Sequence, residues 1–455
     1  MELTSKTYHT AKKRGCWLGG CARLSPPARQ LELAMLAAVA VPPVLMRMCD
    51  AQSPIRRLPQ GQRFCASLEK DCARSWAMLR RRLLNATGPP LVALGQPTTC
   101  GYGTDMMERT GIVGIAAGMR RPVVFDNNMS EPMRLVAQPH DDILAAGLRA
   151  EVAAEARGYP SIMACEATLK QSAKPLIPHK CVGVGGKQPT RVVLNPDWDA
   201  NNSYWNYQSD GGKPGKHAAE KLFPHMAIHF ISHNAIGAFG PLIAARSIPP
   251  ALRHGASMST SARCITARYL DRVSVDALER ATALLSRLRA TGKIHAVHVR
   301  RGDSAMNREC PKCVAKDEPD ILTEDRITMR RIGEVLGELN HTLQPGDGVF
   351  LASDTRGGLR IARQLLNGVP ISFQRHGGPS SSRGAGKGTL GVAKETDGVA
   401  AVHSTQLTGV VAATKLLADF IAMAISDQLT RLGDSSLSGC ASTLGVHFHG
   451  DSPGV

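Results

Sequence analysis

Aromatic side chains make up only 4% of this chain of 455 residues, and no strand is rich in the aromatics that stack RNA bases. Helix-turn-helix and zinc-finger spacings are also missing. Acidic residues are few: 38 Asp and Glu stand against 55 Lys and Arg, a net charge of +17. This excess suggests an anionic partner such as nucleic acid, a lipid surface or a nucleotide-sugar. Because the basic residues are spread over the whole chain, compositional bias is favoured and no nucleic-acid partner is expected.

The first apolar run, Leu33–Met46, has about 14 residues, fewer than the roughly 20 that span a bilayer. It follows a basic tail, and Arg47 lies on its far side. A short signal-anchor, an uncleaved signal-like segment and a plain surface helix all remain open. The basic tail favours the anchor, which predicts a Golgi membrane protein of type II with a lumenal catalytic part and a membrane contact through the N-terminal segment.

Ten of the twelve cysteines follow this apolar run, which is compatible with disulfides in an oxidising compartment, although the pairing cannot be deduced. Cys310 and Cys313 have no second pair at zinc-ribbon distance, so a local disulfide or two free thiols is expected. No Asp-x-Asp lies between apolar strands to hold a metal–nucleotide-sugar complex. We therefore expect no metal and no cofactor.

The segment Lys293–Asp303 carries the strongest chemical signal. Ile294–Val299 is apolar and β-branched and follows a helical run, which predicts a buried parallel strand. The strand ends on Arg300 and Arg301. Ligands of open α/β sheets bind beyond the carboxyl ends of the strands, and guanidinium binds phosphate bidentately. An anion site is one interpretation, and a solvated basic patch is the other.

Before this segment the pattern predicts a few scattered elements. Ser67–Leu84 has a helical pattern within an irregular, basic stem. A helix from Met106 to Gly118 and a strand at Pro122–Asp126 open an α/β unit. Two further helices are expected at Ala218–His229 and His233–Ala245.

From Val273 onward, helices and strands alternate, which predicts a doubly wound sheet. The expected elements are helices at 276–289, about 324–341, 358–366 and Thr405–Leu417, and strands at 294–299, Val349–Ala352, Val369–Phe373 and Asp419–Ile425. Ser426 would open a final helix from Leu429, where backbone N–H groups and a hydroxyl can hold a phosphate. The Gly- and Ser-rich segment Gly377–Gly398 lacks Walker spacing and is expected to be a flexible insertion.

Four blocks of the chain resemble α1,6-fucosyltransferases of the core and nodulation type. They are Cys100-Gly-Tyr-Gly followed by a helix and Arg121-Pro-Val-Val-Phe-Asp; His298-Val-Arg-Arg-Gly-Asp303; Val349-Phe-Leu-Ala-Ser-Asp354; and Gly409-Val-Val with Ala418-Asp-Phe-Ile and Ser426-Asp-Gln428. Each block is weak or moderate alone, but they occur in the family's order and spacing.

The resemblance implies an α/β protein of GT-B-like architecture, with two Rossmann-like lobes and the donor-binding lobe C-terminal. It further implies an inverting, metal-independent transfer of L-fucose from GDP-β-L-fucose to a glycan or glycoprotein acceptor, with α1,6 linkage possible. By position, Arg300 would bind the β-phosphate with Arg301 beside it, and His298 would contact the guanine. Asp354 would shape the donor pocket, and Ser426 and Gln428 would bind the diphosphate.

The chain departs from the family at the catalytic glutamate, whose position falls on Arg308. Of the two nearby carboxylates, Glu309 is our candidate for the base, and Asp303 is expected to orient the arginines or cap the loop. A catalytically degenerate, fucosyltransferase-like binding protein is therefore the alternative function.

The predicted organisation divides the chain into six parts. These are a basic tail (1–30), a possible signal-anchor (31–48), a stem (49–95), an acceptor-side lobe (96–285), a GDP-fucose-binding lobe (286–433, with the insertion at 377–398) and a loose tail (434–455).

Overall fold

The computed structural model contains three sheets and the helices that pack on them. It describes residues 45–46, 48–94, 102–125, 137–138, 141–160, 179–182, 189–194, 225–231, 258–270, 272–300, 329–353, 356–374, 410–433 and 435–445. Two of the sheets are mainly parallel, and the third is a small antiparallel one. The predicted α/β fold class, with two Rossmann-like sheets in one chain, is confirmed.

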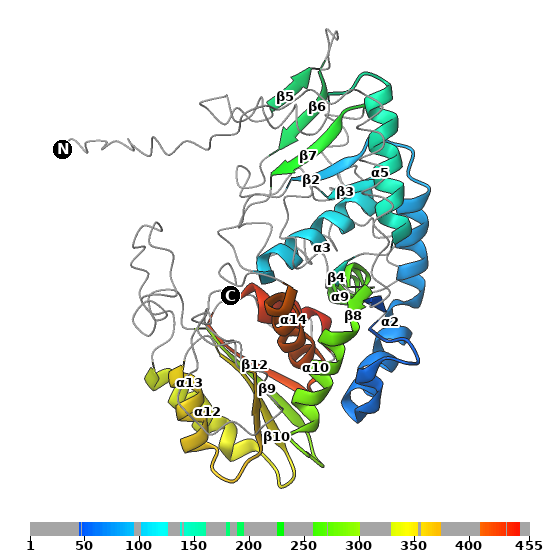
Figure 1. The fold of residues 1–455 in the computed structure, drawn as a ribbon. Coiled ribbons are helices and arrows are strands. Elements are labelled where there is room, and N and C mark those ends of the chain that lie inside the picture. The colour runs from blue at the N-terminus through cyan, green and yellow to red at the C-terminus, as the bar shows by residue number, and fades with distance from the viewer. Residues whose placement is uncertain are drawn as a thin grey trace, which may run out of the picture. The chain divides into compact units, whose positions relative to one another are not determined.

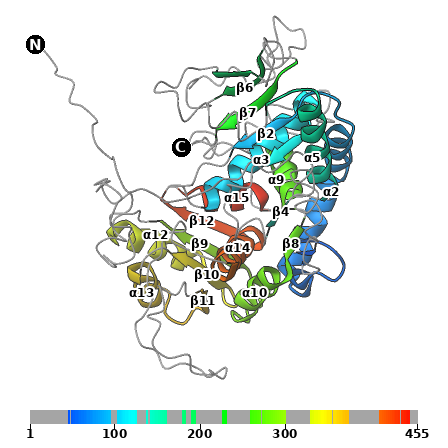
Figure 2. The same ribbon diagram turned by 45° about the horizontal axis from the view of Figure 1, so that its top comes forward.

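The N-terminal sheet has the strand order β3-β2-β7-β6-β5 and is parallel except for its β5 edge. Its strands are β2 (Leu91–Leu94), β3 (Val123–Phe125), β5 (His179–Val182), β6 (Pro189–Leu194) and β7 (Ala227–Ile231). Helix α3 (Tyr102–Met119) connects β2 to β3, and α5 (Asp141–Ala156) follows β3 (Figure 1). Figure 2 shows α3 and α5 beside β2. The helix and the strand predicted after Met106 are confirmed.

Two predictions for this half are wrong. Residues 49–94 are no stem, because α2 (Pro59–Leu84) buries Phe64, Leu68 and Leu83 in the main core, and β2 lies inside the sheet. The helix expected at Ala218–His229 also fails where the structure describes it. There β7 pairs with both β2 and β6, so tertiary pairing overrides a helical pattern. The helix expected at His233–Ala245 lies outside the described residues.

The C-terminal sheet is wholly parallel, with the strand order β11-β10-β9-β12. Its strands are β9 (Ile294–Val299), β10 (Gly348–Ser353), β11 (Ile371–Phe373) and β12 (Gln428–Leu432). Every residue of β9 is buried, as its continuous apolar pattern predicts. The chain therefore adds β10 and β11 on one side of β9 and then crosses over to place β12 on the other.

Helices cover both faces of this sheet (Figure 1). Ile294 and Ala296 pack with α10 (Val275–Ser286) and α14 (Val410–Ile425), while Val297 and Val299 pack with α12 (Met329–Thr342) and α13 (Arg356–Leu365). Helix α10 begins at an N-cap, where the Ser274 hydroxyl accepts a hydrogen bond from the N–H of Ala277 at 3.3 Å. The predicted helices at 276–289 and 358–366 and the strands between them are confirmed, and the helix predicted at about 324–341 is confirmed from Met329, where its described residues begin.

The prediction for the end of the chain has helix and strand exchanged. Asp419–Ile425, expected as a strand, completes α14, whose last six residues are all buried hydrophobics. A helix that is apolar all round is a core helix and looks like a buried strand in sequence. Leu429, expected in a helix, lies in β12. The tail expected after Gly433 instead contains α15 (Ser436–Leu444), with Cys440 and Leu444 buried.

Two disulfides join α2 to its surroundings. Cys49 pairs with Cys65, and Cys72 pairs with Cys264 on α9 (Met258–Tyr269). Just before Cys49, Leu45–Met46 form β1, which pairs with β8 (Arg272–Ser274) in the small sheet with β4 (Ala137–Gln138). The end of the predicted anchor is thus part of a sheet, and the rest of it lies outside the described residues. Within the ranges given above, no helix combines the length and the apolarity needed to cross a bilayer.

Candidate functional site

The candidate site lies at the carboxyl edge of the C-terminal sheet, between β9 and β12. The strand order reverses at β9, because β10 lies on one side and β12 on the other. In open α/β sheets this reversal opens a crevice beyond the carboxyl ends of the two strands, where ligands bind. Arg300 directly follows β9 and therefore lies at the edge where this rule places a ligand. The sequence prediction of Arg300 at a strand end is confirmed.

The backbone of Arg300 is fixed by β12. Its N–H donates a hydrogen bond to the carbonyl oxygen of Leu432 at 2.7 Å, which extends the ladder between β9 and β12 by one residue. Gly433 then turns the chain away with a φ of +87°. A Cβ on Gly433 would lie 2.2 Å from the carbonyl oxygen of Arg300, so only glycine fits here.

His298 lies on β9 two residues before Arg300 and is buried. Burial, with smaller contributions from the cations Arg300 and Arg431, lowers the pKa of His298 to about 3. The imidazole is therefore neutral at physiological pH and can both donate and accept a hydrogen bond. Its Nδ1 atom is buried and has no hydrogen-bond partner among the described residues.

Arg431 lies at the same edge of the sheet, and sequence reasoning missed it. It is the residue of β12 that pairs with His298, so it lies on the strand beside β9, near the same edge as Arg300. Its side chain is exposed, and its charge acts on the same imidazole as that of Arg300. Sequence reasoning expected a helix from Leu429 and therefore did not place Arg431 on a strand. A strand pattern at Gln428–Leu432 would have put an arginine on the same edge as Arg300.

Helix α15 begins just beyond the end of β12. Ser435 is its N-cap residue, in extended conformation, and its side chain makes no capping hydrogen bond. The first N–H groups of a helix are without intrahelical partners and attract anions. Ser435 and Ser436 thus occupy the strand-end position at which Ser426 was expected.

Ser426 and Gln428, which the resemblance assigns to the diphosphate, do not lie near Arg300 in the structure. Gln428 pairs with His295, at the amino end of β9, roughly 16 Å along the strand from Arg300. Ser426 is fully buried, and its hydroxyl donates to the carbonyl oxygen of Ala422 at 2.7 Å. The cause is the exchange of helix and strand described above, which moves these residues from a strand end to a strand start.

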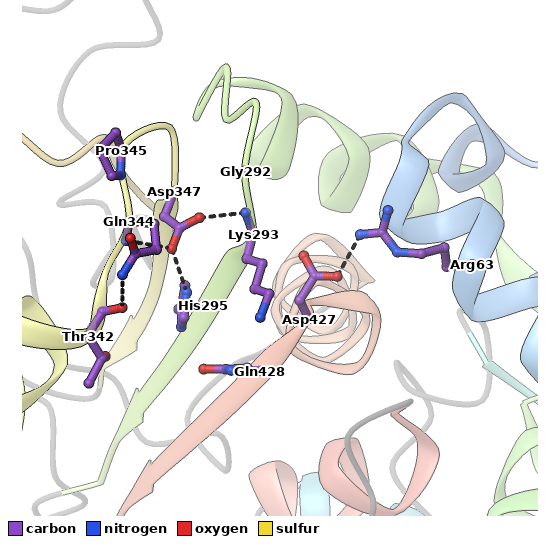
Figure 3. Close-up of a pocket in the computed structure, with 10 residues that line it drawn as sticks. All are labelled: Arg63, Gly292, Lys293, His295, Thr342, Gln344, Pro345, Asp347, Asp427 and Gln428. Carbon is purple, nitrogen blue, oxygen red and sulfur yellow. Dashed lines mark hydrogen bonds and ion pairs between the residues drawn. The ribbon is translucent and has the colours of Figure 1, made fainter.

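Gln428 instead lines a cavity of about 570 Å³ at the amino edge of the sheet (Figure 3). The carboxylate of Asp347, buried in its wall, accepts hydrogen bonds from the N–H of Lys293 at 2.7 Å, the N–H of Gln344 at 3.0 Å and Nε2 of His295 at 3.2 Å. Asp427 accepts from the N–H of Ile294 at 2.9 Å and pairs with Arg63 at 2.6 Å. Two carboxylates occupied in this way hold the loops at this edge together.

Four candidate residues lie outside the described residues: Arg301, Asp303, Glu309 and Asp354. The described residues next to them show only where each of these segments leaves the sheet. Arg301 follows Arg300 at the end of β9, and Asp354 follows Ser353, which pairs with Val299 at the end of β10. Among the described residues, no group of three or more His, Cys, Asp or Glu side chains could hold a metal ion.

No protein-family model and no curated protein matches the chain. Two solved structures are similar at low identity. A point mutant of FUT1 from Arabidopsis thaliana in complex with GDP is 11% identical, with a TM-score of 0.45 over 85% of this chain and 76% of that chain. POFUT1 in its apo form is 11% identical, with a TM-score of 0.29 over 79% of this chain and 96% of that chain. Similarity at this level carries no functional argument, so function is argued from the residues of the chain itself.

Proposed function

We propose that the protein is a glycosyltransferase that transfers L-fucose from GDP-β-L-fucose to a glycan acceptor, with inversion and without a metal. The observation that carries the proposal is the position of Arg300 in the motif His298–Asp303, at the switch point of a parallel sheet. The motif resembles the donor motif of α1,6-fucosyltransferases, and the switch point is where such a sheet binds ligands. An α1,6 linkage is the finer form of the proposal.

The chemistry of the reaction suits these residues. Fucosyl transfer expels GDP from an oxocarbenium-like centre, so positive charge must stabilise the leaving diphosphate as its bond to fucose breaks. Arg300 supplies that charge, with Arg301 beside it. Neutral, buried His298 contacts the guanine, and Asp354 shapes the donor pocket. Glu309 accepts the proton of the acceptor hydroxyl, and Asp303 orients the loop.

The test is incubation of the purified protein with GDP-fucose on a glycan array, followed by detection of transferred fucose, with GDP affinity measured by calorimetry. Transfer that survives a chelator supports the proposal. GDP binding with no transfer to any acceptor selects the alternative, a degenerate nucleotide-sugar-binding protein, which the arginine at position 308 favours. Salt-sensitive RNA binding with no affinity for GDP would contradict both.

We further propose that the catalytic part works in an oxidising compartment, the lumen of the Golgi. The disulfides Cys49–Cys65 and Cys72–Cys264 support this, because such bonds persist mainly outside the reducing cytosol. Protease protection of a C-terminal tag in intact microsomes is the measurement. Digestion of the tag before detergent is added would contradict a lumenal location.

A further inference from the structure

A second cation reaches the crevice from the opposite strand. Arg431 pairs in register with His298, and the next residue, Leu432, accepts the N–H of Arg300 at 2.7 Å. Arg431 and Arg300 are therefore held by the same short stretch of ladder, one on each side of the switch point. Because both strands are parallel and end together, both side chains start from the same edge of the sheet.

The charges of Arg300 and Arg431 both act on the imidazole of His298, so the two guanidinium groups lie on the same side of the sheet edge. The neighbouring ring of His298 adds no third positive charge, because burial and both guanidinium groups keep it neutral. A ligand with two adjacent negative charges could contact both guanidinium groups at once. A nucleoside diphosphate has that charge distribution, whereas a nucleoside or a neutral sugar does not.

We propose that Arg431 binds the diphosphate of the nucleotide donor from the β12 side of the crevice, while Arg300 binds it from the β9 side. This inference rests on the proposed function and assigns a further binding residue to it. One arginine on each strand would hold the two phosphates from both sides. The leaving group would then stay fixed in the crevice while the bond to the sugar breaks.

The experiment compares Arg431→Ala and Arg431→Lys with wild type in titrations with GDP, guanosine and inorganic pyrophosphate. Arg330→Ala is the matched control: it removes the same charge from a side chain that is 89% exposed and pairs with Glu334 at 3.5 Å. Arg431→Ala should weaken GDP and pyrophosphate binding by about tenfold or more, and guanosine binding by less than about twofold. Arg431→Lys should recover part of the loss, because the charge returns without the planar fork.

The outcomes separate this inference from the proposed function. If wild type binds GDP and Arg431→Ala binds it equally well, the role of Arg431 is overturned and the proposed function stands. An equal loss for guanosine and GDP also overturns it, because the residue would then not act on the phosphates. If pyrophosphate binding depends on Arg431 but wild type transfers no fucose, the anion site stands and the transferase function falls. An unchanged thermal midpoint shows that the variants are folded.

Discussion

The N–H of Arg300 donates to the carbonyl oxygen of Leu432 at 2.7 Å, which makes Arg300 part of the ladder between β9 and β12. A side chain that follows a strand directly is usually placed by a loop. Here the neighbouring strand fixes its backbone, and its guanidinium therefore starts from a rigid position. Preorganisation of this kind strengthens electrostatic stabilisation of a charged leaving group, since little reorganisation is needed when charge develops.

Gly433→Ala should displace Arg300. The substitution puts a Cβ at a φ of +87° and only 2.2 Å from the Arg300 carbonyl oxygen, so the backbone must shift. We expect a loss of about 1–3 kcal/mol in the free energy of unfolding and weaker GDP binding. Gly368→Ala is the matched control, because its φ is +84° but nothing lies within 4 Å of the new Cβ. Equal effects of the two variants on GDP affinity would contradict the prediction.

Arg300→Lys should lower transfer activity strongly although the charge is kept. A lysine ammonium is a point charge and cannot replace the planar, bidentate contact of guanidinium with a phosphate. We expect a loss of about 2–4 kcal/mol in transition-state stabilisation, measured as kcat/KM for GDP-fucose. Arg330→Lys serves as the exposed control. Near-normal turnover and GDP affinity in Arg300→Lys would contradict a role of Arg300 in binding the diphosphate.

His298 should make the protein less stable as the pH falls. Its pKa is lowered from 6.5 to about 3, so below pH 6.5 the unfolded chain takes up a proton that the folded chain refuses. The free energy of unfolding should therefore fall by up to about 1.4 kcal/mol per pH unit in this window, compared with His298→Gln. Urea unfolding from pH 7.5 to 4 measures the difference. His341→Gln, at an exposed position on α12, controls for the loss of an imidazole.

Asp347→Asn should destabilise the amino edge of the sheet at neutral pH. Burial raises the pKa of Asp347, but hydrogen bonds from the N–H groups of Gln344 and Lys293 and from His295 outweigh it, and the pKa lies below its ordinary value. An asparagine would replace one accepting oxygen with an NH₂ group that cannot accept these hydrogen bonds. We expect this to lower the free energy of unfolding by about 1–3 kcal/mol.

The pH dependence of Asp347 has the sign expected for a depressed carboxyl pKa. Its contribution is fully present above the unfolded pKa of about 4, and is lost as the pH falls through the folded pKa. The difference in the free energy of unfolding between wild type and Asp347→Asn should therefore become smaller only at acidic pH. Glu279→Gln is the exposed control: it breaks the ion pair with Arg57 and should change stability little. A difference in the free energy of unfolding that stays constant down to pH 2 would contradict a lowered pKa for Asp347.

Sequence patterns predicted those elements whose hydrophobic period and composition both indicate the same type of secondary structure. β9 is apolar throughout and ends on arginines, and α12 places Ile332, Leu336 and Leu339 at helical spacing, so both were predictable. The same reasoning failed for α14, because Phe420–Ile425 is apolar at every position and carries no period. That single error displaced Ser426 and Gln428 and hid Arg431. The pairing of β12 with β9 is a long-range contact that no local pattern reports.

The N-terminal half was harder to predict because long-range contacts hold it together. The segment 49–94 is basic and irregular in sequence, yet two disulfides and the burial of Phe64 and Leu83 make it part of the core. Arg263 shows the same effect: its buried guanidinium donates to Asp71 at 2.7 Å and to the Leu444 carbonyl oxygen at 3.0 Å. Such a residue looks like surface charge until its partners are known.

Glu309→Gln tests the base, the role for which the chain offers the fewest candidates. Asp303 and Glu309 are the carboxylates close after β9 in sequence, and Asp303 follows Gly302 so closely that a role in orienting the loop is expected. A base acts in the chemical step and not on the bound donor. Glu309→Gln should therefore lower kcat by about 100-fold or more and leave GDP affinity unchanged, whereas Asp303→Asn should weaken both. Normal turnover of Glu309→Gln would place the base in the acceptor-side lobe or show that the protein is no transferase. If Glu309→Asp transfers more fucose than Glu309→Gln, the assignment of Glu309 as the base is supported, because a carboxylate one methylene shorter still accepts a proton.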